Sequence, residues 1–420
     1  MSEIVPFSCI RPSCNEVAVQ STMPVDTFSD QEVVEELRTN PRSFMHLAAA
    51  AMEFPGTADW RPDAGVEAAQ SLIAEMLSDG SLIDDQEPSY YLYMMVLPNG
   101  KSQTGVVGCL SIDEYEKNAV KKHEDTRTDK EDGVIRHVEA CGAQTAALFL
   151  AYRGCESRVP AIVESIVTRD APIYDFVLTG IRNAVWTVSD PDDVNELKVA
   201  LAQIPELFIA DGHHRSAAAR RSGIAARRAA LESGSLAAGE KLPSDYVMSI
   251  VFPDDQLTVF EYNRSVSDLG GLTPDEFLAK VGEEFTVTGP LPGRIKPERR
   301  GIMGMYLGGS WYRLEYTRAE LEESLVDRLD VSILQNRLLD PILGIKDPRT
   351  DKRLDFVRGT RPIEDLENRV INGEPAAVSF LLYPTDIQDL FAVADEGGLM
   401  PPKSTWFSPK ARCGLFIYRV

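Results

Sequence analysis

The amino-acid sequence predicts a mixed α+β protein, and three observations support this fold class. Helical and strand-like segments follow one another irregularly along the 420 residues, without the regular βαβ order of a Rossmann sheet or a barrel. Hydrophobic residues make up 44% of the chain and charged residues 26%, which is typical of a soluble globular protein. A chain of this length can bury a large core and usually contains two domains.

Local signals place several elements. Ser29 and Glu32 have the spacing of a capping box, which predicts the start of a helix. Residues 90–97 and 104–112 are apolar and strand-like, and the Pro-Asn-Gly-Lys segment between them predicts a hairpin. Further helices are expected over 66–77, 170–182, 191–204, 217–228, 275–281, 331–343 and 387–395, and further strands over 184–188, 207–209, 245–252, 257–262, 285–287, 301–307, 311–316, 378–382 and 414–418.

The composition changes near residue 268, where two glycines precede Thr273 and Pro274. We therefore expect a phosphate-binding domain with insertions over residues 1–268. Residues 269–420 are expected to form an α+β subdomain whose C-terminal loop returns to the site.

Charge and motif content exclude several classes of protein. The 65 acidic and 43 basic side chains leave a net charge of −22, which disfavours nucleic acid as a partner. The six cysteines include no C-x-x-C pair, so a zinc site is not expected. The N-terminal residues do not resemble a signal peptide, and no run of eighteen apolar residues occurs, so we expect a cytoplasmic protein without a membrane partner. The sequence does not indicate an oligomeric state.

The most informative segment is Asp211-Gly212-His213-His214-Arg215, which contains two of the five histidines. An apolar run precedes it and an alanine- and arginine-rich helical stretch follows, so the order is strand, glycine turn and helix N-terminus. The amides and dipole of a helix N-terminus attract anions, and arginine and imidazole donate to phosphate oxygens. This pattern predicts a phosphate site, in which Asp211 either holds a metal ion or orients one histidine.

A structural interpretation of the same segment is also available. Asp211 could cap the helix, and both histidines could be partly buried spacers. Two adjacent histidines with an arginine at a strand-to-helix turn favour the functional interpretation.

Two other segments carry candidate residues. Residues 121–132 are highly polar and without a hydrophobic period, which predicts a loop. Its His123, Glu124 and Arg127 could supply a general base, a magnesium ligand or a phosphate contact, but an ordinary solvated loop would look the same.

The second segment, residues 400–410, is proline-rich. Its candidate phosphate ligands are Lys403, Ser404, Thr405 and Lys410. The alternative is a surface turn packed by Trp406 and Phe407.

Together these three segments resemble domain-of-unknown-function family 1015, in the ParB/sulfiredoxin-like superfamily. The resemblance covers nearly the whole chain and includes residues 5–7, 329–334 and 341–345. It implies a ParB/sulfiredoxin-like nucleotide-binding core, elaborated by a second α+β subdomain. True ParB proteins add a helix-turn-helix unit, which we do not find, so this resemblance implies ancestry and not DNA binding.

Within that superfamily, the archaeal ADP-dependent serine kinase carries a similar Asp-Gly-x-His-Arg element. The match extends to Asp211, Gly212, His214 and Arg215, with His213 at the variable position. The kinase also uses a carboxylate before its first helix. Its nearest counterpart is Asp26, where the usual Pro-Pro-Tyr-Asp is Met-Pro-Val-Asp.

The resemblance and the residues together predict a phosphotransferase that acts on a small hydroxyl substrate, with L-serine or O-phosphoserine as the sharpest choice. ADP, ATP or pyrophosphate would be the donor, with Mg²⁺. Positive and imidazole side chains would neutralise the phosphoryl group, and Asp26 or Glu124 would accept the hydroxyl proton. The alternatives are a nucleotide-binding regulatory protein without turnover, a phosphoserine phosphatase and, least favoured by the charge, a DNA-binding factor.

Overall fold

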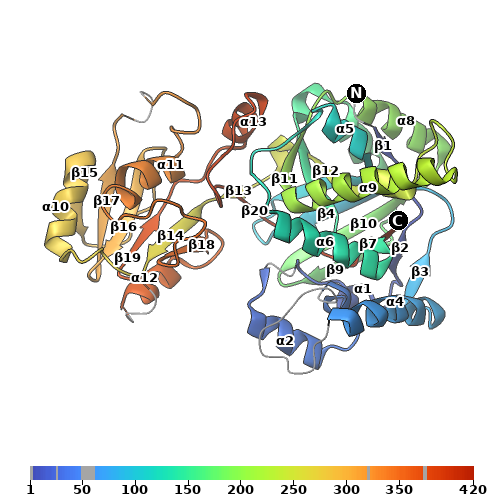
Figure 1. Ribbon diagram of the computed structural model, residues 1–420, viewed down its shortest axis with the longest axis horizontal. Helices are drawn as coiled ribbons and strands as arrows, with labels where there is room; N and C mark the ends of the chain where they lie inside the picture. The colour runs from blue at the N-terminus through green and yellow to red at the C-terminus, as the bar shows by residue number, and fades with distance from the viewer. Residues whose placement is uncertain (1–2, 25–26, 49–61, 319–321, 372–375) are drawn as a thin grey trace. The chain divides into compact units, whose positions relative to one another are not determined.

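A computed structural model describes residues 3–24, 27–48, 62–318, 322–371 and 376–420, without the side chains of residues 30 and 62–68. The chain forms two compact units (Figure 1). Unit 1 comprises Met1–Leu257 and Pro409–Val420, and unit 2 comprises Thr258–Ser408. The junction expected near residue 268 therefore lies within unit 2.

A mixed nine-stranded sheet forms the centre of unit 1. Its order is β6-β11-β8-β12-β5-β4-β10-β9, with β1 paired to β5. The pairs β11–β6 and β12–β8 are parallel and the other pairs are antiparallel. The strands are β1 (Ile4–Val5), β4 (Tyr90–Val96), β5 (Ser102–Ser111), β6 (Val120–Lys121), β8 (Leu148–Tyr152), β9 (Tyr174–Leu178), β10 (Ile181–Val188), β11 (Leu207–Asp211) and β12 (Tyr246–Pro253).

Helices and two small ladders complete unit 1. Figure 1 shows α6 and α9 side by side against the sheet. The α-helices are α1 (Val17–Gln20), α2 (Asp30–Thr39), α3 (Met45–Ala48), α4 (Pro62–Ser78), α5 (Ile112–Glu116), α6 (Thr128–Cys141), α7 (Val159–Arg169), α8 (Pro191–Ala202) and α9 (His213–Ser233). The ladders pair β2 (Ile10–Pro12) with β3 (Leu82–Asp84), and β7 (Ala143–Gln144) with β21 (Tyr418–Arg419).

Alternation along the strands divides the core of unit 1 between the two faces of the sheet. Leu148 and Leu150 of β8 join residues of α7 and α8, such as Ile166 and Leu197, in the main hydrophobic cluster. Phe149, which points the other way, stacks on Phe252 of β12 with ring centroids 4.4 Å apart. Within the described residues, no helix has both the length and the apolar composition needed to cross a membrane.

Unit 2 contains a six-stranded antiparallel sheet of order β15-β17-β16-β19-β14-β18 and a separate two-stranded ladder, β13-β20. The strands are β13 (Val259–Phe260), β14 (Tyr262–Val266), β15 (Thr286–Leu291), β16 (Ile302–Leu307), β17 (Ser310–Glu315), β18 (Leu354–Arg358), β19 (Val378–Leu381) and β20 (Trp406–Phe407). The helices are α10 (Pro274–Glu284), α11 (Asp330–Leu334), which continues into a π-helical turn (Gln335–Leu339), α12 (Ile363–Ile371) and α13 (Ile387–Asp395). The α+β fold class predicted from the sequence is thereby confirmed.

The hairpin predicted over residues 90–112 is present as β4 and β5, and the Ser29–Glu32 capping box begins α2. The helix predicted over residues 170–182 is wrong. Helix α7 ends at Arg169, and the following residues form the β9–β10 hairpin. Thr179 and Gly180 both have positive φ, as a tight turn that matches the strand twist requires.

The loop predicted over residues 121–132 is only partly correct, because α6 begins at Thr128 within it. Asp129 and Glu131 lie in the first turn of α6, where carboxylates are favoured by the helix dipole. The polarity of this segment therefore reflects a helix start as well as a loop.

Two helical glycines in unit 1 differ in the space around them. A β-carbon at Gly223 of α9 would lie 2.3 Å from the carbonyl oxygen of Ser244, whereas at Gly133 of α6 its nearest contact would be 3.9 Å away. We expect Gly223→Ala to lower the free energy of unfolding by about 1–3 kcal/mol. Gly133→Ala should raise it by about 0.5–1 kcal/mol. Denaturant unfolding followed by circular dichroism tests this pair, and effects of the same sign would contradict the packing described.

Candidate functional site

The candidate site lies where β11 passes into α9, as the sequence predicts. Leu207, Phe208 and Ile209 are fully buried and anchor the strand, which delivers Asp211 to its end. Gly212 follows with φ 102°, and α9 begins at His213. A β-carbon at Gly212 would lie 3.0 Å from the Arg215 side chain. Glycine therefore provides both the left-handed turn and the space for that arginine.

The carboxylate of Asp211 binds two cationic side chains. One oxygen accepts from Nη2 of Arg215 at 2.6 Å, and the other accepts from Nζ of Lys410 at 2.5 Å. Nη1 of Arg215 also donates to the carbonyl oxygen of Ala147 at 2.7 Å. Lys410 is only 6% exposed, whereas 28% of the Asp211 side chain remains exposed. Two buried or half-buried cations thus converge on one carboxylate that is open to solvent.

The charge of this cluster follows from the pKa of Asp211. Burial would raise this pKa, but Lys410 and Arg215 together lower it to about 2. Asp211 is therefore ionised at neutral pH, and the cluster carries more positive than negative charge. Asp211 does not cap the helix, because its carboxylate accepts hydrogen bonds from Arg215 and Lys410 and the N-cap residue is Gly212. The N-terminus of α9 and these cations favour an anion.

His213 faces inward and contacts His123. The two rings meet edge to face with their centroids 4.5 Å apart, and the backbone N–H of His123 donates to Nε2 of His213 at 3.5 Å. Burial lowers the pKa of His213 to about 4 and the pKa of His123 well below its usual value. Both imidazoles are therefore neutral at neutral pH. Because Nε2 of His213 accepts a hydrogen bond, its proton is on Nδ1.

The remaining candidates of unit 1 are placed as follows. Glu124 is next in sequence to His123, whose backbone contacts His213. His214 is half-buried in the first turn of α9. Arg127 is exposed and pairs with Asp129 at 2.9 Å. Asp26 lies outside the described residues.

Three candidates belong to unit 2, unlike Lys410. Lys403, Ser404 and Thr405 precede β20. Nζ of Lys403 lies 5.6 Å from the centre of the Tyr262 ring, and the hydroxyl of Ser404 donates to the carbonyl oxygen of Pro401 at 2.6 Å. The structure therefore groups Asp211, His213, Arg215, Lys410 and His123, and it groups the earlier part of the 400–410 loop with unit 2.

The residues present do not fit a magnesium ion bound directly to Asp211. Both oxygens of this carboxylate already contact cations, which a divalent ion would have to displace. Among the described residues, no group of three or more His, Cys, Asp or Glu side chains could hold a metal ion.

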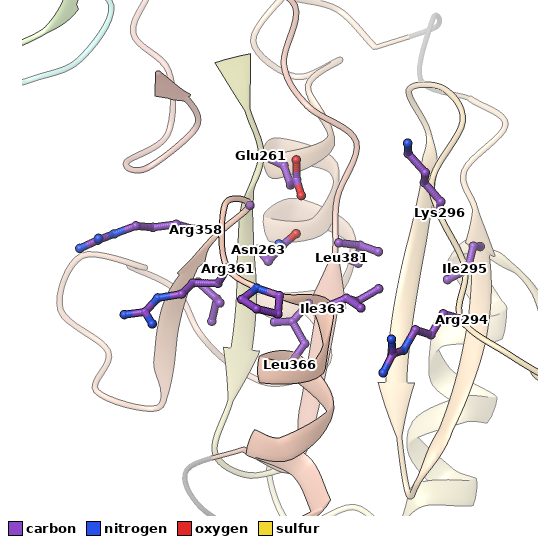
Figure 2. Close-up of a pocket in the computed structure, with 13 residues that line it drawn as sticks. Glu261, Asn263, Arg294, Ile295, Lys296, Arg358, Arg361, Ile363, Leu366 and Leu381 are labelled. Atoms are coloured by element: carbon purple, nitrogen blue, oxygen red, sulfur yellow. The ribbon is translucent and has the colours of Figure 1, made fainter. Parts of the chain in front are cut away.

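Sequence reasoning missed two features. The Ala147 carbonyl that holds Arg215 is a backbone group, which has no side-chain signature. It also missed a cavity of about 360 Å³ in unit 2 (Figure 2). The spacing of Arg358 and Arg361 around Gly359, at the end of an apolar strand, was a usable signal for it.

The low pKa of His213 predicts a pH dependence of stability. The usual pKa of histidine is 6.5, so as the pH falls below this value the unfolded chain takes up a proton at His213 that the folded chain does not. Stability is therefore lost as the pH falls from 6.5 towards 4. In His213→Gln, the decrease in unfolding free energy between about pH 7 and about pH 5 should be smaller than in the wild type by about 2 kcal/mol. Parallel stability profiles for the two proteins, measured by urea unfolding, would contradict this assignment.

Three solved structures are similar to this chain at low sequence identity. Free serine kinase in complex with AMP is 14% identical, with a TM-score of 0.36, and the match covers 72% of this chain and 86% of that one. SbnI with a C-terminal truncation, from Staphylococcus aureus, is 12% identical, with a TM-score of 0.36 and coverages of 74% and 85%. A conserved hypothetical protein from Pyrococcus furiosus is 14% identical, with a TM-score of 0.34 and coverages of 72% and 90%. These scores are low, and the function proposed below rests on the site geometry.

A search of curated proteins finds no match to this chain. The family model described as a protein of unknown function (DUF1015) matches residues 4–332, which is more than half of the chain. The resemblance to domain-of-unknown-function family 1015 is thereby confirmed, and the chain belongs to the DUF1015 family.

Proposed function

We propose that this protein is a phosphotransferase that acts on a small hydroxyl compound, with free L-serine as the first acceptor to test. The donor would be ADP, ATP or pyrophosphate. The observation that carries the proposal is the pair of cations, Arg215 and Lys410, held on Asp211 beside the N-terminus of α9. Phosphoryl transfer depends mainly on positioning and on neutralising charge, which are the two properties of this cluster.

The cluster suits a phosphate because its cations are ordered before the ligand arrives. Asp211 and the Ala147 carbonyl fix the Arg215 guanidinium, and burial fixes Lys410. An entering phosphate can accept from these cations and from the amides of the first turn of α9. Asp211 acts as a positioning residue, since its own contacts are with the cations. Preorganised donors lose little conformational entropy when the phosphate binds.

His213 contributes a hydrogen bond and not charge. His213 is neutral and carries its proton on Nδ1, so this atom can donate but adds no positive charge at neutral pH. Neutralisation of the moving phosphoryl group is therefore assigned to Arg215 and Lys410.

In the proposed reaction, the bond between phosphorus and the oxygen of the donor breaks as the bond to the acceptor hydroxyl oxygen forms. The hydroxyl proton passes to a carboxylate. Glu124 is our candidate for this base, because it follows His123, whose backbone contacts His213. Asp26 remains a second candidate from the sequence.

A phosphorus NMR assay with an arginine variant tests the function. Wild-type protein, magnesium, L-serine and one donor at a time (ADP, ATP or pyrophosphate) should produce a new phosphomonoester signal. Arg215→Ala should slow this reaction by at least about a hundredfold, since it removes a donor to the transferring group. The matched control is Arg220→Ala on the same helix, where the arginine is half-buried and pairs with Glu116, and it should retain the wild-type rate.

The same spectra distinguish the alternatives. A regulatory protein would bind a nucleotide without forming any product, and a phosphatase would release inorganic phosphate from O-phosphoserine without a nucleotide. Equal rates for Arg215→Ala and the wild type would refute the proposed role of the cluster.

A second variant tests the base. Glu124→Gln keeps the size of the side chain but cannot accept the hydroxyl proton. We expect kcat to fall by about a hundredfold or more, with little change in the dissociation constant of the nucleotide. If binding and kcat fall together, Glu124 contributes to the binding site and not to proton transfer.

A further inference from the structure

Unit 2 contains a second cavity, with a volume of about 270 Å³, which none of the residues discussed for phosphoryl transfer lines. Its walls come from Arg300 just before β16, from Leu329 and Asp330 at the start of α11, and from residues between Tyr383 and Asp389, which lead from β19 into α13. All of these residues belong to unit 2. A cavity of this size accommodates a small molecule.

The carboxylate of Asp330 is the feature that points to a ligand. This residue is only 5% exposed, and its Oδ1 accepts a hydrogen bond from the backbone N–H of Gly301 at 2.7 Å. Its Oδ2 is buried and has no hydrogen-bond partner, and no other carboxylate among the described residues of unit 2 has a buried oxygen in this state. A buried acceptor without a donor is unfavourable. The cavity that Asp330 lines is the space from which a ligand can supply the missing donor.

The charged lining of the cavity is mainly acidic. Three aspartates and one arginine line it. The arginine, Arg300, forms an ion pair with Asp389. Asp386 is the N-cap residue of α13 and accepts a hydrogen bond from the backbone N–H of Gln388 at 2.8 Å. Because Arg300 offsets only one of the three carboxylates, the cavity favours a cation over an anion.

The lining suits an organic cation better than a metal ion. Nowhere in the described part of the chain could three or more His, Cys, Asp or Glu side chains together hold a metal ion, so the three aspartates do not converge on one point. Leu329, Pro384 and Tyr383 add apolar surface to the cavity. An aromatic ring such as that of Tyr383 attracts a cation to its face, and a primary ammonium group carries the N–H donors that Oδ2 of Asp330 lacks.

The protonation of Asp330 is sensitive to such a ligand. Burial raises the pKa of this carboxyl to about 7, although the backbone amides of Gly301 and Tyr383 and the charges of Arg300 and Arg299 lower it. An ammonium ion favours the ionised carboxylate. Its binding therefore releases a proton wherever Asp330 is protonated beforehand.

We propose that this cavity binds a small primary ammonium ion with a short apolar body. The ammonium group donates to Oδ2 of Asp330, and the apolar body lies against Leu329 and Tyr383. The site is separate from the Asp211 cluster, which lies in unit 1, and the proposal does not depend on phosphoryl transfer.

Isothermal titration of the full chain with n-butylammonium chloride tests the proposal. We expect Asp330→Asn to bind n-butylammonium at least about tenfold more weakly than the wild type, because the charge is lost while an acceptor for the Gly301 amide remains. The matched control is Asp340→Asn, which removes an exposed carboxylate of unit 2 that does not line the cavity and should keep the wild-type affinity. This control also reports any general attraction of a cation to an acidic protein. Circular dichroism verifies that all proteins are folded.

The pH dependence of the wild type tests the same contact without a substitution. With a pKa of about 7 for Asp330, the affinity for n-butylammonium should rise about tenfold between about pH 6 and about pH 8, since the ammonium ion binds the ionised carboxylate. Asp330→Asn should show no such rise. A flat profile for the wild type would show that binding does not involve Asp330 and would overturn the proposal.

Two further probes test the parts of the ligand. n-Butanol lacks the charge, and tetramethylammonium has the charge but no N–H donor, so each should bind at least about tenfold more weakly than n-butylammonium. Equal affinity for tetramethylammonium would overturn the hydrogen bond to Oδ2. Wild-type affinity in Asp330→Asn, or no binding to the wild type at about 10 mM n-butylammonium, would overturn the whole proposal.

Discussion

The ionised carboxylate of Asp211 is the constraint on which the candidate site depends. It joins Arg215 in the first turn of α9 to Lys410 near the C-terminus, two residues that are far apart in the sequence. Arg215 extends this connection to the Ala147 carbonyl, next to the start of β8. The Coulomb attraction in an ion pair is stronger when the pair is partly shielded from water, and removal of one partner leaves the other charge poorly solvated. The same contacts that hold three segments together also hold two cations ready for a phosphate.

The neighbouring histidines show why the protonation state has to be derived from burial. Two imidazoles near a phosphate site suggest positive charge, but His213 and His123 are buried against each other and remain neutral. A second charge next to Arg215 and Lys410 would be repelled and poorly solvated. The site therefore combines the cations of Arg215 and Lys410 with neutral imidazoles, and titration of His213 and His123 does not change its charge near neutral pH.

Unit 2 also contains basic side chains close to a carboxylate, but the residues and their environment differ from those of unit 1. In both units, basic side chains lie near carboxylates, although the chain as a whole is strongly acidic. The difference is in the partners. In unit 1 the carboxylate is ionised and fixes the cations, whereas in unit 2 the pKa of Glu261 is raised and the cations line an apolar cavity.

The sequence by itself determined the α+β class, the β4–β5 hairpin, the Ser29 capping box and the strand-turn-helix layout around Gly212, because these depend on local periodicity, turn chemistry and backbone conformation. It did not determine residues 170–182, where the β9–β10 hairpin, docked on β4, overrode a helical composition, since the pairing of β10 with β4 is a non-local interaction. Only the tertiary structure decided which candidates meet. It brought Lys410 and His123 to the turn before α9 and placed Lys403 to Thr405 in unit 2. It also formed the cavity of unit 2 from segments that are far apart in the sequence. The reason is that residue type and spacing encode what a side chain can do, whereas its partners and its pKa are set by the packing of segments that the linear order does not relate.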